Sequence, residues 1–146
     1  LDIDDFKSFN DNYGHRVGDQ ALIAVAKIIS RCVAEYCKGT PAELYATRFG
    51  GEEFALILPN IAEPEAASLA ETIRSNIKEY NFLIRDDKGE IIQKGISLSA
   101  SFGVAQHFSN HTSKDDTETL INNADKAMYS AKNNGKNQVV QFGAIS

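Results

Sequence analysis

Apolar residues recur at helical spacing in three parts of the chain, which predicts three amphipathic helices. The second of them carries Pro64 in its expected first turn, a position that favours proline. A polar loop is expected just before the third, over residues 107–116. The helices are expected over roughly residues 18–37, 64–80 and 117–133.

Shorter runs of branched and aromatic residues predict strands. "ELYATRF" and "EFALIL" flank Gly50 and Gly51, which is typical of a β-hairpin. "IIQKGISLSASFGVAQ" is expected to form a strand or hairpin arm, with a serine alternation on one face of a sheet, and "QVVQF" a closing strand. This order of strands and helices suggests an antiparallel sheet with helices packed on one face.

Length and charge restrict the class of protein. The 146 residues fit a single domain, and the opening "LDIDDF" resembles the end of a strand, so we expect one domain over residues 1–146 that is truncated at its N-terminus. The net charge of −5 argues against a nucleic-acid or membrane-surface binder, although a few local cations could hold a single nucleotide. Without a signal peptide, a long apolar run or a disulfide pattern, we expect a soluble, cytoplasmic domain.

The N-terminal segment is rich in acids, and two familiar explanations for them fail. A calcium loop that begins at Asp2 would need an oxygen ligand, a glycine and a glutamate where Phe6, Lys7 and Tyr13 stand. No part of the chain matches the GxxxxGK[ST] pattern of a phosphate-binding loop.

Asp2 at the end of a strand and Glu52 at the hairpin turn remain as candidate partners. If the hairpin lies beside the first strand of an antiparallel sheet, the two acids can meet. Magnesium is usually held by one or two carboxylates together with substrate phosphates, so Mg²⁺ that carries a polyphosphate would relieve the repulsion at this turn. Two independent solvated acids are the alternative interpretation.

Four sequence blocks in register resemble the GGDEF family of diguanylate cyclases, in the variant with Glu at the third signature position. They are "DIDDFKSFNDNYGHRVGDQAL", "RFGGEEF", "LSASFGVA" and "ADKAMYSAKNNGKN". The resemblance implies an α+β, nucleotidyl-cyclase and ferredoxin-like βαββαβ core, with a mainly antiparallel five-stranded sheet and helices packed around it. It also implies a homodimer that condenses two GTP into cyclic di-GMP and releases pyrophosphate.

The resemblance assigns the metal ligands and the catalytic groups. The carboxylates of Asp2 and Glu52 and the backbone carbonyl of Ile3 match the ligands of two Mg²⁺ ions, with Mn²⁺ as an alternative metal. Glu53 is the better candidate for the proton acceptor and Glu52 the alternative, and Lys7 is included among the catalytic residues.

The resemblance also assigns a substrate site. Asn10 and Asp19 match the positions that read guanine, although an Asx residue in a loop and an acid in the first turn of a helix are the structural alternatives. Lys132 and Lys136 match a phosphate clamp, in which the family more often has Arg at the second position; ordinary charges at a helix C-terminus are the alternative. The full set is Asn10, Asp19, Phe6, Lys7, Gly50, Gly51, Lys132 and Lys136.

Regulation and partners follow less directly. Pro41 and Leu44 stand where many members carry the R-x-x-D inhibitory site, so product inhibition through that site is expected to be absent. A sensory domain is expected upstream, and membrane anchoring of the full-length protein is left open. A module that binds GTP or cyclic di-GMP without turnover is the alternative function.

Overall fold

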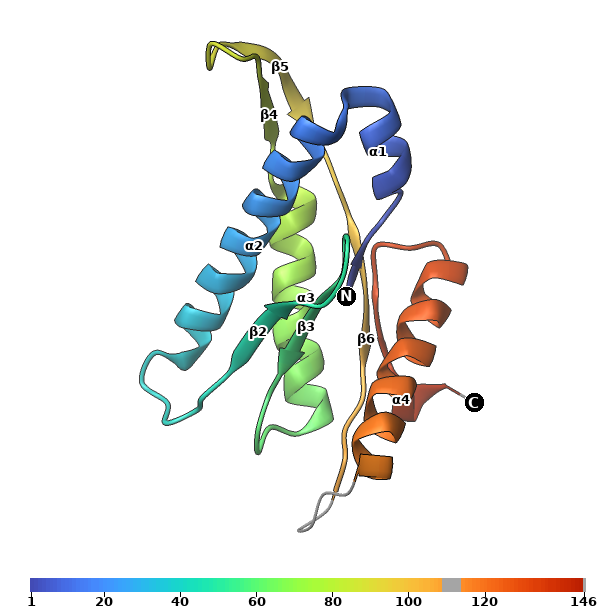
Figure 1. Cartoon of the computed structure of the whole chain (residues 1–146). Helices are drawn as coiled ribbons and strands as arrows, with labels where there is room; N and C mark the ends of the chain where they lie inside the picture. Colours follow the sequence, from blue (N-terminus) through green and yellow to red (C-terminus); the bar gives the residue numbers. More distant parts are fainter. Residues whose placement is uncertain (109–113, 146) are drawn as a thin grey trace.

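The computed structural model describes residues 1–108 and 114–145 (Figure 1). The middle of the predicted polar loop, residues 109–113, lies outside the described residues. The elements in chain order are β1 (Asp2–Ile3), α1 (Phe6–Tyr13), α2 (His15–Cys37), β2 (Tyr45–Arg48), β3 (Phe54–Ile57), α3 (Glu63–Glu79), β4 (Phe82–Arg85), β5 (Ile91–Ile96), β6 (Ala100–Val104), α4 (Lys114–Asn133), β7 (Val139–Gln141) and the 3₁₀ helix η1 (Phe142–Ala144). The three helices predicted from periodicity correspond to α2, α3 and α4, whereas α1 and β4 were not expected.

The strands form a three-stranded sheet and two hairpins. In the order β1-β6-β7, β1 is antiparallel to β6 and β6 is parallel to β7. β2 pairs with β3, and β4 with β5, both antiparallel. A bridge between Asp2 and Glu53, with a 3.0 Å bond from the Phe54 N–H to the Leu1 carbonyl, connects β3 to β1. Because this connection is a single bridge, one continuous five-stranded sheet stays a prediction.

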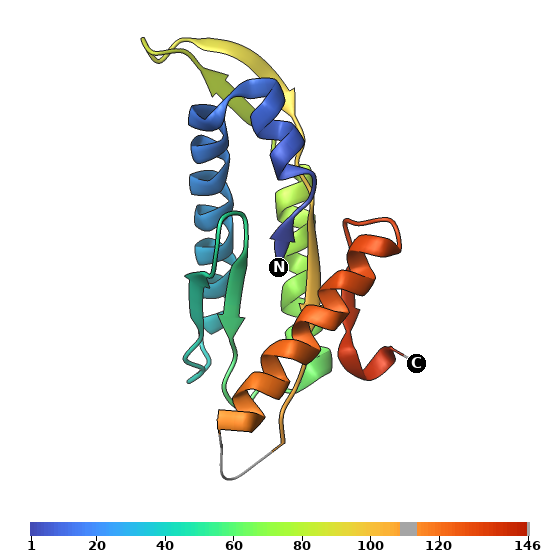
Figure 2. The same cartoon turned by 45° about the vertical axis from the view of Figure 1, so that its right-hand side comes forward.

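Helices cover both faces of β6, so the prediction that they pack on one face is wrong. Phe102 is buried in the core that includes residues of α2 and α3. Its neighbour Gly103 points to the other face of the strand and lies against the backbone of α4. Figure 2 shows β6 between α3 and α4, while the β2–β3 hairpin lies beside α2. We refer to the side that α4 covers as the α4 face.

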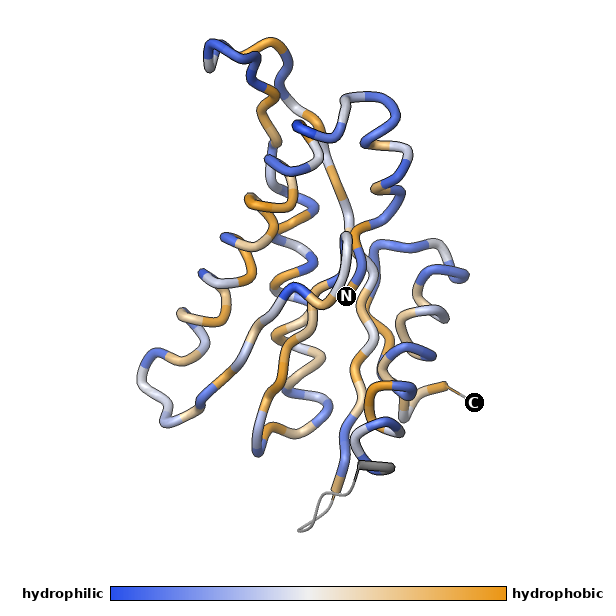
Figure 3. Tube along the Cα trace, in the orientation of Figure 1, coloured by the Kyte–Doolittle hydropathy of each residue, from blue (hydrophilic) through white to orange (hydrophobic). Residues whose placement is uncertain are grey.

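The core explains why the long helices form where they do. The buried residues of α2 recur at three- and four-residue spacing, and those of α3 do the same. Figure 3 shows the corresponding apolar stretches in α2, α3 and β6, and polar residues at the tip of the β4–β5 hairpin. None of the described helices has the length and hydropathy needed to cross a membrane.

The alternating run 91–106 is divided between two sheets. Its first part, β5, pairs only with β4, with register shifts along the pair, whereas β6 pairs with β1 and β7. Gly95 has a positive φ of 75°, and residues 97–99 lie outside both strands. The run therefore forms two strands, β5 and β6, separated by residues 97–99, rather than one continuous strand.

We expect Gly103→Ala to destabilise the domain, because α4 packs too closely for a side chain at this position. An added Cβ would lie 2.0 Å from the Ala124 carbonyl oxygen and 2.3 Å from the Met128 nitrogen, and backbone cannot rotate away. Overpacking of this kind costs about 1–3 kcal/mol. Urea denaturation should show a lower midpoint for this variant, whereas Gly51→Ala, where nothing lies within 4 Å of the added Cβ, should change it little. Equal midpoints for the two variants would contradict the packing argument.

Candidate active site

Acidic side chains from two strands meet on the α4 face. Asp2 pairs with Ser101 on one side and with Glu53 on the other. Residues directly opposite in an antiparallel pair project to the same face, so these side chains share it. Asp2 and Glu53 also line one pocket, of about 790 Å³, together with residues of α4 and η1.

Glu52 is connected to the first strand through its backbone. The Ile3 N–H donates to the Glu52 carbonyl over 3.3 Å, and the Ile3 side chain is buried in the core. Glu52 lies in the turn before β3, with a half-buried side chain. The structure therefore brings both signature acids beside β1, but the direct cross-strand partner of Asp2 is Glu53.

Lys132 reaches from the last turn of α4 to the oxygens of the first strand. Its Nζ lies 2.5 Å from Asp2 Oδ1, 3.0 Å from Asp4 Oδ1 and 3.3 Å from the Ile3 carbonyl oxygen. Burial alone would lower the pKa of Lys132, but the hydrogen bonds and charges of Asp2 and Asp4 outweigh it, so the pKa is raised. The ammonium is therefore held in its charged form among three oxygen acceptors.

Asp4 is a buried acid that the sequence reasoning missed. Its carboxylate accepts from the hydroxyls of Ser99 and Ser101, both over 2.7 Å, and from the Asn137 N–H over 3.0 Å. Burial alone would raise the pKa of Asp4, but these hydrogen bonds and the one from Lys132 lower it. Two of the alternating serines therefore serve this buried carboxylate, a role that alternation on one face of a sheet did not suggest.

The turn after α4 holds a second lysine near the first one. Lys136 and Asn137 have positive φ values of 62° and 47°. Lys136 Nζ lies 2.6 Å from Asp5 Oδ1, and the amide oxygen of Asn137 accepts from Arg74 of α3 over 2.7 Å. The two predicted phosphate lysines thus end at the same N-terminal segment, on neighbouring acids.

The signature turn is held by an arginine rather than by left-handed glycines. Neither Gly50 nor Gly51 has a positive φ, so the turn does not require glycine for a left-handed backbone. A Cβ added at Gly50 would lie 2.9 Å from the end of the Glu53 side chain, which would have to move. The Arg48 guanidinium donates to the Gly51 carbonyl from Nε and Nη2, over 2.9 and 2.7 Å. Its place just before the signature was the only sequence signal for this role.

Asn10 of α1 presents an unusual buried amide. Its Oδ1 is buried and accepts no hydrogen bond from the described residues. A Cβ added at Gly18 of α2 would lie only 1.8 Å from this oxygen. Phe6, a predicted substrate contact, is buried beside them and stacks on Phe9 at 6.0 Å between ring centroids. Phe6 thus packs in the core beneath α1, the helix that carries Asn10, and exposes little of its side chain to a substrate.

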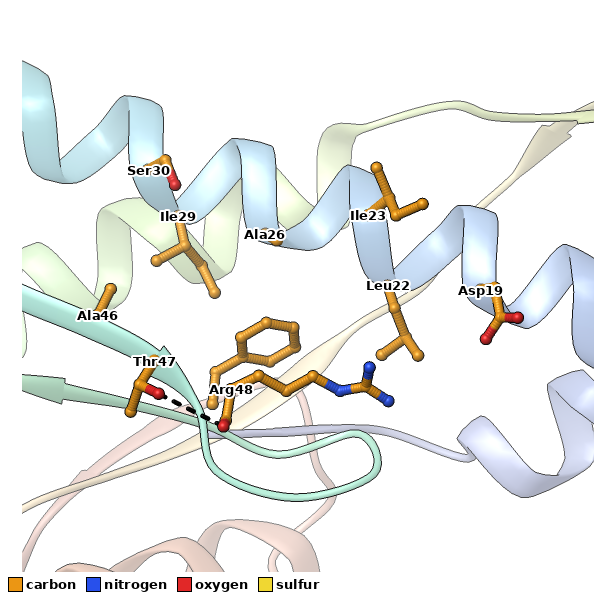
Figure 4. Close-up of a pocket in the computed structure, with 10 residues that line it drawn as sticks. Asp19, Leu22, Ile23, Ala26, Ile29, Ser30, Ala46, Thr47 and Arg48 are labelled. Carbon is orange, nitrogen blue, oxygen red and sulfur yellow. Dashed lines mark hydrogen bonds between the residues drawn. The ribbon is translucent and has the colours of Figure 1, made fainter.

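Asp19 lies at one end of a second pocket, of about 540 Å³, between α2 and the β2–β3 hairpin. Figure 4 shows apolar side chains of α2 on one wall and Arg48 on the other, with its guanidinium extended toward Leu22 and the end where Asp19 lies. Lys7, on α1, is exposed and makes no hydrogen bond or ion pair with the described part of the chain. The predicted residues thus fall into an acid–lysine group on the α4 face and an Asn10–Asp19 group at α1 and α2.

We expect Gly18→Ala to destabilise the domain by displacing Asn10. Replacing glycine by alanine in a helix normally raises the folding stability by about 0.5–1 kcal/mol, but here the new methyl group overlaps the Asn10 amide. In an Asn10→Ala background the overlap is gone, so the same substitution should become neutral or stabilising. Denaturant midpoints of the four proteins measure the difference, and the same effect in both backgrounds would rule out the overlap as its cause.

The oxygens around Lys132 suit a hard divalent cation. They comprise the carboxylates of Asp2 and Asp4 and the backbone carbonyl of Ile3, which are ligand types of Mg²⁺, and they already attract a cationic group. Within residues 1–108 and 114–145, no three His, Cys, Asp or Glu side chains gather as a metal site. Magnesium needs few protein ligands when a substrate supplies phosphate oxygens, so this donor set fits it.

Curated proteins with similar sequences carry consistent names. The chain is 40% identical over 140 residues to diguanylate cyclase VdcA of Vibrio cholerae, covering 96% of this chain and 37% of that protein. It is 36% identical over 139 residues to diguanylate cyclase A of Treponema denticola, covering 95% of this chain and 33% of that protein. The chain therefore spans about a third of the length of these relatives.

Solved structures with similar folds agree. The GGDEF domain of DgcB from Caulobacter crescentus, in complex with c-di-GMP, matches with a TM-score of 0.77 and 31% identity, over 98% of this chain and 75% of that one. The active GGEEF domain of a Vibrio cholerae diguanylate cyclase matches with a TM-score of 0.75 and 31% identity. The match covers 97% of this chain and 78% of that one. The predicted fold class is thereby confirmed. Residues 1–138 match the family model described as diguanylate cyclase, GGDEF domain, and the chain belongs to this family.

Proposed function

We propose that this chain is the catalytic domain of a diguanylate cyclase that condenses two GTP into cyclic di-GMP and releases pyrophosphate. The observation that carries the proposal is the acid–lysine group, in which Asp2, the Ile3 carbonyl and Lys132 meet beside the signature turn. Family membership supports the same activity. The relatives are about three times longer than this chain, so the activity of the whole protein is part of the proposal.

The first strand and the signature turn provide the metal site and the base in this proposal. Asp2, the Ile3 carbonyl and Glu52 would hold two Mg²⁺ ions, for which Mn²⁺ could substitute. When bound, the metal neutralises phosphate charge and lowers the pKa of the attacking 3′-hydroxyl. Glu53 is the proton acceptor, a role supported by its position opposite Asp2 in the same pocket.

Asn10 and Asp19 read the guanine base. A carboxylate can accept from the N1–H and the exocyclic amine of guanine, a pair of donors that adenine does not present. The position of the Asn10 amide supports a shared role, because it lies against Gly18, the residue before Asp19. Specificity for GTP over ATP is therefore assigned to this pair.

Lysines bind the triphosphate, and the signature glycines leave room for it. Lys132 and Lys136 are supported by their position beside the first strand. Lys7 is available for a phosphate because no acid in the described part of the chain holds it. A lysine in place of the usual arginine at position 136 keeps the charge but loses the two-pronged contact of a guanidinium.

Catalysis requires two GTP-loaded domains that face each other, so the proposed active form is a homodimer. Its proposed location is the cytoplasm, and the domain is proposed to be joined to an upstream sensory domain. The test is to incubate the full-length protein with GTP and Mg²⁺ and to identify the products by mass spectrometry. We expect cyclic di-GMP and pyrophosphate, with no product from ATP. A dimeric protein that binds GTP but forms no product would instead be a nucleotide-binding module.

A further inference from the structure

We infer that Lys132 serves as an internal cation that occupies the metal site until a metal ion and a triphosphate arrive together. The inference rests on the metal site of the proposed function. It concerns how the site is loaded, which none of the residue roles above describes.

The contacts of Lys132 are the basis of the inference. Two of its three acceptors, Asp2 Oδ1 at 2.5 Å and the Ile3 carbonyl at 3.3 Å, are oxygens assigned to the metal. The Lys132 side chain is 23% exposed and that of Asp2 is 19% exposed, so both are largely withdrawn from water. The ammonium therefore neutralises the acid at the place where the metal is expected.

The lysine and the metal compete for these oxygens in the proposed site. Mg²⁺ requires oxygen ligands at about 2.0–2.1 Å, which places it in the volume that the ammonium fills. Two cations on one carboxylate oxygen would also repel each other. In this proposal Lys132 releases Asp2 and the Ile3 carbonyl when the metal site fills.

Asp4 gives the displaced lysine a fixed partner. It lies 3.0 Å from Lys132 Nζ, and its side chain is only 2% exposed. Ser99, Ser101 and Asn137 hold its carboxylate in position. Lys132 can therefore pivot about Asp4 without losing every charge partner, and its remaining N–H groups become available to phosphate oxygens.

Metal and triphosphate should consequently bind as a pair. A metal ion alone removes Lys132 from two of its three acceptors and gives it no new one, whereas a metal ion with a triphosphate supplies one. Each ligand then strengthens the binding of the other by the same factor, as linkage requires. The expected result is weak binding of free metal and strong binding of the metal–nucleotide complex.

The test measures the affinity of the full-length protein for Mn²⁺ alone, by electron paramagnetic resonance of the free ion. Lys132→Gln should bind Mn²⁺ about tenfold more tightly than the wild type, because a competing hydrogen-bonded cation is lost. Lys136→Gln is the matched control, since it removes one positive charge from the same region but from Asp5 rather than Asp2. Its affinity should change much less.

A second arm adds a non-hydrolysable GTP analogue. The analogue should tighten Mn²⁺ binding in the wild type and should do so much less in Lys132→Gln. An unchanged or weakened Mn²⁺ affinity in Lys132→Gln overturns the inference, as does an increase equal to that of Lys136→Gln. Because these titrations need no turnover, a protein that makes no cyclic di-GMP can still confirm or overturn it.

A measurement on the wild type covers the case in which Lys132→Gln does not fold. The ¹⁵Nζ signal of Lys132 should stay unchanged on addition of a GTP analogue without metal, and it should shift when Mg²⁺ is added as well. A signal that Mg²⁺ and the analogue together leave unchanged would show that the ammonium keeps its acceptors, against the inference.

Discussion

Asp2→Asn is expected to lower the rate of cyclic di-GMP formation by about a thousandfold, while the domain stays folded. Asn keeps the shape of the side chain but loses the charge that attracts both Lys132 and a divalent metal. Metal-ion stabilisation of a phosphoryl transition state is worth several kcal/mol, and about 4 kcal/mol corresponds to this loss in rate. The rate of pyrophosphate release at saturating GTP and Mg²⁺ is the measurement.

Asp125→Asn is the matched control for this experiment. Asp125 lines the same pocket as Asp2 but projects from α4, is exposed, and has no role in the proposed chemistry. Its activity should stay close to that of the wild type. If Asp2→Asn retained more than a tenth of the activity, the first strand would not hold an essential metal ligand.

Asp4→Asn is expected to cost about 3 kcal/mol of folding stability. Asp4 accepts hydrogen bonds from Ser99, Ser101 and the Asn137 backbone, and it pairs with Lys132. The amide of Asn has one oxygen, which can accept from only some of these donors. Its NH₂ group would face another donor, so a buried donor would lack an acceptor. Urea denaturation of the wild type and the variant measures the loss.

Asp5→Asn separates the effect of burial from that of charge. The ion pair between Asp5 and Lys136 is exposed, with side chains 66% and 41% accessible, and exposed pairs contribute about 0–1 kcal/mol. The same chemical change one residue further along should therefore cost much less. Similar losses at both positions would mean that the buried network around Asp4 contributes little.

Local pattern was sufficient for much of the fold. The periodic stripes of α2, α3 and α4 and the two glycines between apolar runs predicted three helices and the β2–β3 hairpin. The polar segment of α1 gave no such signal, and its N-cap, Asp5, is left-handed with no capping hydrogen bond from its side chain. β4 was also missed, although it is as long as β2 and β3 and its buried residues alternate with exposed ones.

The candidate site was predicted as a set of residues, and its geometry was not. Family resemblance selected Asp2, Lys132 and Lys136, but no local pattern could show that both lysines end on acids between positions 2 and 5. The burial of Asp4 depends on Ser99 and Ser101, which are more than ninety residues away in sequence. Such long-range contacts follow from the register between β1 and β6, which a single sequence does not specify.

The hydrogen bond from Arg74 to Asn137 means that α3 helps to position the candidate site, although α3 does not line it. Arg74 fixes the side chain of Asn137, and the backbone of that same residue donates to Asp4, the pivot of Lys132. A substitution of Arg74 on the surface of α3 is therefore expected to impair nucleotide turnover without touching the site itself. Position 74 is better left untouched when the domain is fused to new sensors.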